Sequence, residues 1–337
     1  MSLSKIHLNN FRSFKNSSFN LAKRNLILGK NGAGKSSFLE AIFFVLSKKS
    51  FRSSSSNSMI NFDSDFFKVD AIIEGNKFSF TKDLSSSLRS SFENTLNDFL
   101  PLVINNFSLS LLEAPKENRR SFLDYLMFHV EHDYKIDHLK FKKALAQRNR
   151  ALKKSSSSEL KSWTKVFIEL SEKLTKKKLE FIDSFLKSFP DFVDSLIIPD
   201  SLKAKFKEIS IAYDKGWKES LLEELRESFI TDKARGFTSL GPQTSDLSVK
   251  IKKQDSGNIL SRGEQKLLIL LIYLFFIKAY NVLKPNKTIF LLDDLPSELD
   301  EINLDLALHL LQDIDCQLFI TSLEKMEKYE FDNVIDL

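Results

Sequence analysis

The stretch Gly29-Lys30-Asn31-Gly32-Ala33-Gly34-Lys35-Ser36 fits the pattern G-x-x-x-x-G-K-[ST] in full, and it decides the fold. The apolar segment 24–28 before it predicts a strand, and the apolar segment 36–46 after it predicts a helix. Glycines let a backbone wrap closely around phosphate oxygens, and a helix N-terminus adds the positive end of its dipole. The stretch therefore predicts a phosphate-binding loop within an α/β fold.

The side chains of this loop have the chemistry to hold ATP together with Mg²⁺. Lys35 is expected to reach the β- and γ-phosphates, and the hydroxyl of Ser36 is expected to bind Mg²⁺. Asn31 and Gly32 tolerate the unusual backbone angles that such a loop requires. The nucleotide-binding residues predicted in this region are Gly29, Lys30, Asn31, Gly32, Ala33, Gly34, Lys35, Ser36 and Ser37.

A pair of carboxylates, Asp293 and Asp294, follows the apolar segment 288–292, which predicts a buried strand. Open α/β sheets bind their ligands at the carboxyl ends of the strands. Asp293 is expected to hold Mg²⁺, directly or through water, and Asp294 is expected to orient or deprotonate the attacking water. Together with Lys35, these two aspartates are the predicted catalytic residues.

The stretch Leu260-Ser261-Arg262-Gly263-Glu264-Gln265 opens an apolar segment, residues 264–279, that predicts a buried helix. It is similar to the signature L-S-x-G-[EQ]-Q of ABC ATPases, whose serine and glycine contact the γ-phosphate held by the opposite subunit. This resemblance implies that Ser261, Gly263 and Gln265 contact nucleotide. An ordinary capped helix is the alternative interpretation of the same residues.

The expected arrangement of these motifs predicts an ATP-dependent homodimer. If the phosphate loop and the signature lie on opposite edges of one head, ATP can be enclosed only between two heads, and hydrolysis would release them. The segment Ser297-Glu298-Leu299-Asp300 is expected at that interface. Thr321 and Ser322, at the end of the strand predicted for residues 317–320, are expected near the γ-phosphate.

The order of the motifs predicts an ABC-type P-loop ATPase head, of α/β class, that is split in sequence by a mostly helical insertion forming a short arm domain. Residues 1–112 and 236–337 are expected to form the head, and residues 113–235 the arm. A heptad-like stripe in the arm, interrupted at Lys177, predicts either one face of a helical bundle or a short antiparallel coiled arm. The stripe consists of Leu160, Trp163, Phe167, Leu170, Leu174 and Phe181.

Composition limits the partners and the compartment. The net charge of +5 permits a nucleic-acid partner without requiring one. The single cysteine, Cys316, excludes an internal disulfide and a cysteine-based zinc site, and it is expected to be a small buried side chain. The N-terminal residues lack the apolar core of a signal peptide, and the longest apolar run, residues 267–277, would span only about 16 Å as a helix. We therefore expect a cytoplasmic protein with no membrane partner.

Further short motifs are spread along the chain. Near the N-terminus are Leu8-Asn9-Asn10-Phe11-Arg12-Ser13-Phe14, Leu39-Glu40-Ala41-Ile42 and Ser50-Phe51-Arg52. The insertion contains Arg119-Arg120-Ser121-Phe122-Leu123-Asp124, Phe128-His129-Val130-Glu131 and Ala144-Leu145-Ala146-Gln147-Arg148-Asn149. With Leu291-Leu292-Asp293-Asp294 and the Ser297–Asp300 segment, this set resembles the RecF family of bacterial DNA replication, repair and recombination mediators, which are ABC- and SMC-like ATPases.

One stretch departs from the family pattern. RecF proteins commonly have G-P-H-R-x-D-L ahead of the signature, and here Gly241-Pro242-Gln243-Thr244-Ser245-Asp246-Leu247 stands in its place. The change removes an imidazole and a guanidinium from what we expect to be a surface loop. Any DNA contact or subunit communication that those groups provide is therefore in doubt, although Gly241-Pro242 still supplies the turn.

The resemblance implies ATP-dependent binding to duplex DNA or to single-strand/duplex junctions. Little sequence preference is expected, since no helix-turn-helix or finger pattern is visible, and the short side chain of Asp294 predicts slow ATP hydrolysis. It also implies help in loading the RecA recombinase, with RecO and RecR as partners. Phosphate contacts would require basic side chains. The candidates in the insertion, which could equally form a solvated helix face, are Lys140, Lys142, Lys143, Arg148, Arg150, Lys153 and Lys154.

Three other classes of ATPase-like protein share some of these sequence motifs. A transporter's nucleotide-binding subunit would have a shorter spacing between Lys35 and Ser261, and it would not open with Phe11-Arg12. The head of a long coiled-coil chromosome protein would need a longer insertion with a hinge or a C-x-x-C hook. A catalytically inactive structural subunit stays possible, because Asp294 stands where many ABC ATPases have the longer glutamate.

Overall fold

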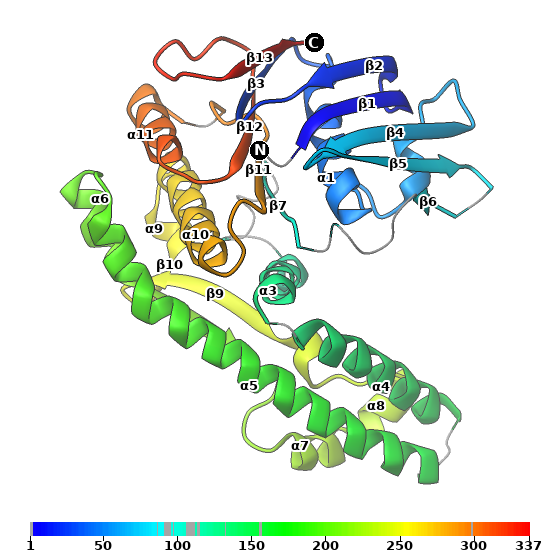
Figure 1. The fold of residues 1–337 in the computed structure, drawn as a ribbon. Coiled ribbons are helices and arrows are strands. Elements are labelled where there is room, and N and C mark those ends of the chain that lie inside the picture. Colours follow the sequence, from blue (N-terminus) through cyan, green and yellow to red (C-terminus); the bar gives the residue numbers. More distant parts are fainter. Residues whose placement is uncertain are drawn as a thin grey trace. The chain divides into compact units, whose positions relative to one another are not determined.

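The structure is a computed structural model that describes residues 3–85, 87–90, 96, 98–105, 112, 115–131, 133–154, 157–297 and 299–337. The chain forms two units. The first, called the head, combines Met1–Leu109 with Ser261–Leu337, and the second, called the arm, is Ser110–Leu260. Each unit is described by itself, with its elements labelled in Figure 1.

In its described residues, the head contains two five-stranded sheets and three long helices. Its helices are α1 (Lys35–Ser47), α10 (Arg262–Leu283) and α11 (Glu301–Gln312), with a short 3₁₀ helix η1 (Ser56–Met59). Its strands are β1 (Leu3–Phe11), β2 (Phe14–Asn20), β3 (Arg24–Leu28), β4 (Phe66–Ile73), β5 (Asn76–Asp83), β6 (Arg89–Ser90), β7 (Leu100–Ile104), β11 (Thr288–Leu292), β12 (Gln317–Ser322) and β13 (Asn333–Asp336).

One of the two sheets is parallel and has the order β13-β3-β12-β11-β7. Its central strands are apolar and buried on both faces, as in sheets that are covered by helices on both sides. The expected strands 24–28 and 288–292 are β3 and β11, and the strand expected at 317–320 is β12. All five strands run in one direction, so their carboxyl ends share one edge of the sheet.

Helices α1 and α10 cover opposite faces of the parallel sheet. Side chains from alternate positions, such as Ile289 and Leu291, share one core with α1. The intervening Phe290 stacks on Tyr273 of α10, with ring centroids 5.8 Å apart. The two helices that follow the phosphate loop and the signature are therefore separated by the sheet (Figure 1).

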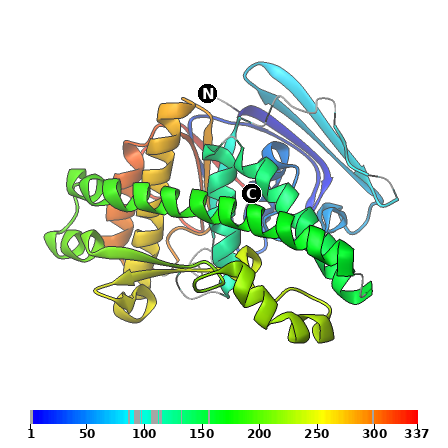
Figure 2. The ribbon, with the colours of Figure 1, turned by 90° about the horizontal axis from the view of Figure 1, so that it is seen from below.

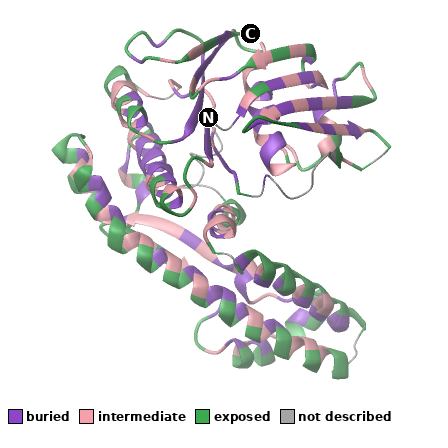
Figure 3. Cartoon of the chain, in the orientation of Figure 1, coloured by how far each residue is buried: buried purple, intermediate pink, exposed green. Residues whose placement is uncertain are grey.

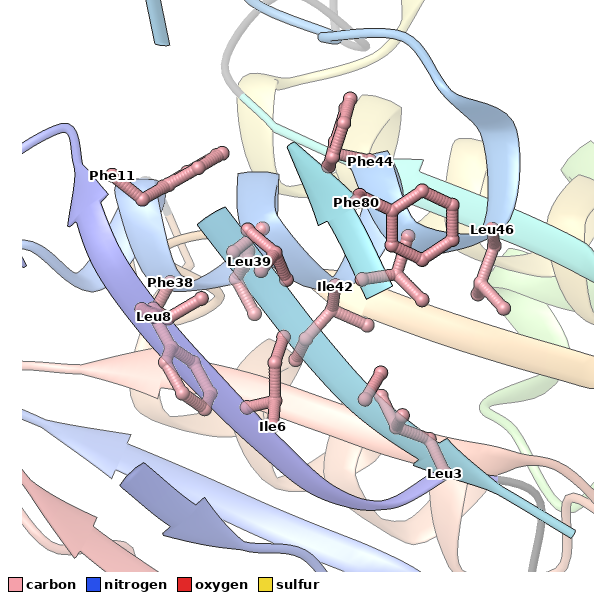
Figure 4. Close-up of a cluster of buried hydrophobic side chains, with 14 of the residues drawn as sticks. Leu3, Ile6, Leu8, Phe11, Phe38, Leu39, Ile42, Phe44, Leu46 and Phe80 are labelled. Atoms are coloured by element: carbon pink, nitrogen blue, oxygen red, sulfur yellow. The ribbon is translucent and has the colours of Figure 1, made fainter. Parts of the chain in front are cut away.

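The second sheet is antiparallel, with the order β2-β1-β4-β5-β6, and it covers the other side of α1. In Figure 4, Ile6 and Leu8 of β1 and Phe80 of β5 lie around side chains of α1. Edge-to-face aromatic pairs join the layers, including Phe44–Phe67 and Phe44–Phe80 at 5.2 and 5.7 Å. Helix α1 is thus packed between two sheets, and the abundant phenylalanines fill that space.

Helix α10 is long and apolar enough to cross a membrane by length and composition alone, and it is the one such helix in the part of the chain that the structure describes. Of its most apolar window, 61% is buried within the protein. Figure 3 shows the helix largely buried. The buried helix expected at residues 264–279 is therefore present as a core element of the head.

The arm joins several helices to a small sheet. Its helices are α3 (Lys116–Val130), α4 (Tyr134–Lys154), α5 (Ser157–Ser195), α6 (Asp200–Lys207), α7 (Leu221–Glu227), α8 (Phe229–Arg235) and α9 (Ser256–Ile259), with the 3₁₀ helix η2 (Pro242–Thr244). Strands β8 (Ile209–Asp214), β9 (Asp246–Ile251) and β10 (Gln254–Asp255) form an antiparallel sheet of order β10-β9-β8.

Both interpretations of the heptad-like stripe describe part of the arm. Helices α4 and α5 pack side by side and antiparallel, because Arg148 contacts Thr164 while Asp137 contacts Lys177 further along α5. Members of the stripe also share a core with Trp217, Leu221 and Leu247 from outside this pair. Figure 2 shows α5 as one long helix, and its buried face belongs to a small bundle with a sheet.

Two expectations for the arm need correction. The arm extends to Leu260 and does not end at Arg235, because β9 pairs with β8 and so keeps residues 246–251 in the second unit. The Gly241–Thr244 turn is not a surface loop, because Gly241 and Pro242 are buried. Gln243 donates to the carbonyl oxygens of Thr238 and Leu240, at 3.2 and 2.8 Å.

The family-like motifs of the arm have structural contacts. Arg119 forms a bidentate pair with Asp246, with N–O distances of 2.8 and 2.9 Å. Arg148 is only 2% exposed and lies against Asp232, with its Nη1 atom 3.6 Å from a carboxylate oxygen. It also donates to Thr238 and, at 3.2 Å, to Thr164. Burial lowers the pKa of the Arg148 guanidinium, against the opposing effect of Asp232. Arg148 therefore cannot serve as a DNA contact in this structure, and that expectation was wrong.

Replacement of Arg148 by methionine is expected to destabilise the arm by about 3–5 kcal/mol, because it leaves the buried Asp232 without its cation. Both tryptophans of the chain, Trp163 and Trp217, lie in the arm, so tryptophan fluorescence during urea unfolding follows this unit. Lys135→Met, at an exposed position of the same helix, is the matched control. Equal unfolding midpoints for the two variants would contradict the structural role of Arg148.

Candidate active site

The predicted phosphate-binding loop lies between β3 and α1. Gly32 and Gly34 have φ angles of +85° and +108°, in the left-handed region that glycine adopts at little cost. Asn31, for which unusual angles were also expected, is not among the residues with positive φ. The first backbone N–H groups of any α-helix lack an intrahelical partner, and at the start of α1 the N-cap residue, Gly34, has no side chain to accept from them. This uncapped donor set suits an anion.

Gly34 is required for a second reason. A Cβ atom at this position would lie 2.8 Å from the hydroxyl of Ser13 and 3.2 Å from the ring of Phe14. Ser13 belongs to the turn between β1 and β2 and Phe14 begins β2, and both are part of the family-like opening of the chain. The close approach of this turn to the loop explains why the two motifs occur together.

The ammonium group of Lys35 lies over the loop. It donates to the carbonyl oxygens of Gly29, at 2.5 Å, and Lys30, at 3.1 Å. A cavity of about 570 Å³ borders the same loop and is lined by residues 28–33 together with Leu323, Lys325, Asp336 and Leu337. Open space therefore borders the first part of the loop, whereas Lys35 and the start of α1 are not in the lining of this cavity.

The two aspartates lie at the carboxyl end of β11, and Thr321 of β12 organises both of them. The Thr321 hydroxyl donates to Oδ1 of Asp293 at 2.9 Å and accepts from the backbone N–H of Asp294 at 2.7 Å. Thr321 is fully buried, and Asp294 has a φ of +57°, which is uncommon for a residue other than glycine. Thr321 therefore orients the carboxylate of Asp293 and holds the backbone of Asp294.

Sheet order determines how the loop and the aspartates are placed. Strand β12 lies between β3 and β11, with Ser322 beside Leu28 and Ile320 beside Leu292. Two strand spacings separate the loop strand from the aspartate strand, roughly 10 Å. The end of β12, with Thr321 and Ser322, therefore lies between the predicted phosphate site and the predicted catalytic carboxylates.

The signature residues begin α10 and cap it. The Ser261 hydroxyl accepts from the backbone N–H of Glu264 at 3.3 Å, and the Glu264 carboxylate accepts from the N–H of Ser261 at 2.9 Å. This capping box is the alternative arrangement considered from the sequence. Ser261 is exposed, whereas Gly263 is buried and Gln265 is only 2% exposed. Of the three residues, the structure presents Ser261 at the surface.

Lys266, the residue after the signature, was missed by the sequence interpretation. Its side chain is 4% exposed, and its ammonium donates to the carbonyl oxygens of Asp294, at 3.1 Å, and Ser297, at 2.6 Å. It therefore ties the first turns of α10 to the segment that follows the aspartates. One feature of the sequence could have indicated it: Lys266 is a charged residue within an apolar helix, and a buried lysine almost always has polar partners.

The segment expected at a dimer interface is described in part. Glu298 lies outside the described residues. Asp300 is the N-cap of α11, where its carboxylate accepts from the backbone N–H of Asn303 at 2.8 Å. Ser297 accepts from Lys266 through its carbonyl oxygen, so this segment has a structural function within one head.

A buried ion pair joins three of the family-like motifs beside α1. Glu40 is fully buried and accepts from Nε and Nη2 of Arg12, at 2.8 and 2.7 Å. Ser50 donates to the same carboxylate, and Arg52 donates to the hydroxyl of Ser37 at 3.3 Å. The motifs around Arg12, Glu40 and Arg52 thus form one polar cluster that reaches the start of the loop helix.

The chain is similar to known proteins in sequence and in fold. A family model described as the RecF/RecN/SMC N terminal domain matches residues 2–337. The DNA replication and repair protein RecF of Pseudoalteromonas translucida is 32% identical, covering 96% of this chain and 92% of that protein. The protein of the same name from Saccharophagus degradans is 30% identical, covering 89% of this chain and 85% of that protein. A solved structure described as the recombination mediator protein RecF-ATP in the RecFOR pathway has a similar fold, with a TM-score of 0.83 at 24% identity, covering 99% of this chain and 95% of that one.

Thr321→Val is expected to loosen the segment after β11, because valine can neither donate to Asp293 nor accept from the N–H of Asp294. An unpaired buried N–H costs about 1–3 kcal/mol, and hydrogen exchange of a peptide covering residues 291–297 should become correspondingly faster. Thr321→Ser keeps the hydroxyl and serves as the control, with exchange near that of the unmodified protein. Unchanged exchange in the valine variant would show that the hydroxyl does not hold this segment.

Proposed function

The chain belongs to the RecF family of RecF/RecN/SMC N-terminal-domain proteins, and on that premise we propose that it is an ATP-dependent DNA-binding protein of recombinational repair and replication restart. The observation that supports this most directly is the shared sheet edge, where the loop after β3, Thr321 of β12 and Asp293 after β11 come together. A P-loop ATPase requires a loop that binds phosphates and a carboxylate that helps to hold Mg²⁺, and residues suited to both functions lie at this edge.

In the proposed site, the phosphates of ATP bind at the loop Gly29–Gly34 and the N-terminus of α1. The side chain of Lys35 exchanges its contacts with loop carbonyls for phosphate oxygens. The oxygen donors of Ser36 and Asp293 suit Mg²⁺, which offsets the charge of the phosphates. Thr321 orients the Asp293 carboxylate for that purpose by donating to one of its oxygens.

We assign the orientation or deprotonation of the attacking water to Asp294. Its positive φ and the hydrogen bond from its backbone N–H to Thr321 fix the position of the backbone from which the Asp294 side chain extends. Aspartate is one methylene shorter than the glutamate common at this position in ABC ATPases, so we expect slow hydrolysis. Asp294→Asn should abolish turnover while nucleotide binding persists. Absence of hydrolysis by the unmodified protein would favour the inactive structural subunit.

A nucleotide-dependent homodimer completes the proposal. Helices α1 and α10 lie on opposite faces of the sheet, and Ser261 is exposed at the start of α10. A second copy could therefore present its Ser261 to nucleotide held at the loop, whereas the buried Gly263 would also require a shift of the signature turn. The capping box would have to open or shift for the Ser261 hydroxyl to face a phosphate, so dimer formation is coupled to a rearrangement of the signature turn.

DNA and protein partners belong to the same proposal. A dimer would clamp duplex or gapped DNA and help load RecA, with RecR and RecO as partners in the cytoplasm. Basic side chains on the arm supply a surface for phosphates. After the removal of Arg148 from the set, the exposed candidates are Lys140, Lys142, Lys143, Arg150, Lys153 and Lys154.

The test measures binding of duplex and gapped DNA to the purified protein with ATP, with ADP and without nucleotide, beside a Lys35→Met variant. We expect tight binding with ATP alone that weakens steeply with salt and is lost in the variant, because Lys35 is the loop cation. Sedimentation with a non-hydrolysable ATP analogue should show a dimer. ATP binding without DNA affinity under every condition would overturn the clamp.

Lys266→Met should separate hydrolysis from nucleotide binding. Loss of the ammonium releases the carbonyl oxygens of Asp294 and Ser297, so the predicted water-orienting carboxylate is positioned less well. We expect turnover to fall by roughly tenfold or more, since small misplacements of catalytic groups are costly. The affinity for ATP should stay the same, because Lys266 does not belong to the loop. Equal loss of affinity and turnover would indicate a general defect of the head.

A further inference from the structure

A groove on the arm is unrelated to the predicted nucleotide site. It has a volume of about 740 Å³ and is lined by residues of α4, α5, α7 and α8. On α5 the lining residues Leu160, Thr164 and Ile168 recur every four positions, which places them on one face of the helix. The opposite lining includes Leu222, Leu225 and Phe229, so one elongated apolar surface extends along several helical turns.

Part of this apolar surface is exposed. Leu222 is 41% exposed and Phe229 is 38% exposed. Helix α7 buries its other two leucines, Leu221 and Leu225, whereas α8 also exposes Ile230, at 79%. Neighbouring Leu225, Ala151 and Leu152 are buried and close the base of the groove. A large aromatic ring left beside a concave apolar surface is typical of a binding site.

The charged residues of the groove all have one sign. Its lining includes four exposed cations, Lys161, Lys165, Arg226 and Lys233, and no aspartate or glutamate. Within the described residues none of the four forms an ion pair, and the one contact found for them is that of Lys233 with the ring of Phe229, at 5.9 Å. The fifth cation, Arg148, already pairs with Asp232. Four cations around an apolar groove therefore lack counter-charges.

We propose that this groove binds an acidic amphipathic helix of a partner protein. Such a helix presents large apolar side chains at i, i+3, i+4 and i+7 to the groove and places carboxylates beside Lys161, Lys165, Arg226 and Lys233. Charge complementarity favours an acidic partner over a second copy of this chain, whose net charge is +5. The apolar lining distinguishes the groove from a surface for duplex DNA, whose phosphates make no use of Leu222 or Phe229.

The experiment measures binding of a fluorescein-labelled peptide to the full chain by anisotropy. The probe is an amphipathic sequence of roughly three helical turns, with leucine and phenylalanine on one face and aspartate and glutamate on the flanks. One control peptide has lysine in place of every acid, and another has serine in place of every apolar residue. We expect saturable binding of the acidic amphipathic peptide, at least about tenfold tighter than either control.

Three variants test the assignment to this groove. The double charge reversal Lys161→Glu with Lys165→Glu should weaken the acidic peptide about tenfold or more and gain affinity for the lysine peptide. Phe229→Ser should weaken binding without altering the charges. Lys187→Glu, an exposed position further along the same helix, is the matched control and should bind like the unmodified protein. ATP hydrolysis should be unchanged in all three, so failure here is distinct from failure of the proposed function.

Several outcomes would overturn the proposal. Equal binding of all three peptides would show that the groove does not recognise this chemistry. A dimer that forms without peptide and is disrupted by the charge reversal would make a second copy the occupant. Loss of affinity for single- or double-stranded DNA in the charge-reversal variant, with Phe229→Ser unaffected, would make the surface a phosphate site.

Discussion

Parallel pairing of β3, β12 and β11 is the constraint on which the rest of the head depends. These strands come from opposite ends of the chain, and their backbone hydrogen bonds leave little freedom in register. Because the strands are parallel, the loop after β3, the hydroxyl of Thr321 and the carboxylate of Asp293 must lie at one edge. Apolar side chains on both faces of that sheet pack against α1 on one side and α10 on the other.

Polar contacts at a few buried positions then transmit this geometry to the surrounding segments. Thr321 fixes the aspartates, Lys266 fixes the segment that follows them, and the pair of Arg12 with Glu40 fixes the opening turn beside α1. Each contact joins residues far apart in sequence, and each would leave a costly unpaired group if one partner were removed. The apolar core therefore stabilises the fold of the head, and these few polar contacts fix the positions of the segments around the predicted site.

The arm follows the same logic with a different result. Arg148 and Asp232 join α4 to α8, and Arg119 with Asp246 joins α3 to β9. The arginines of these two family-like motifs therefore stabilise the packing of the arm. Four other cations of the arm, for which the described residues show no ion pair, line the apolar groove between α5, α7 and α8. The basic residues of the arm thus form two groups. Buried ones such as Arg148 pair with carboxylates inside the arm, and exposed ones lie at its surface.

Local periodicity and spacing in the sequence correctly predict strands β3 and β11, the buried helix α10 and the interruption of the head by an insertion, and they motivate the assignment of the phosphate loop and the signature. The sequence interpretation missed β8 and β9 as a sheet, placed the end of the arm at Arg235, and offered Arg148 as a DNA contact. Those points depend on pairing between distant segments and on burial, which no local pattern contains. Only the tertiary structure decided that Thr321 bridges the two aspartates, that Lys266 holds the segment after them, and that Arg148 faces inward, because a side chain acquires its partner only when distant segments pack together.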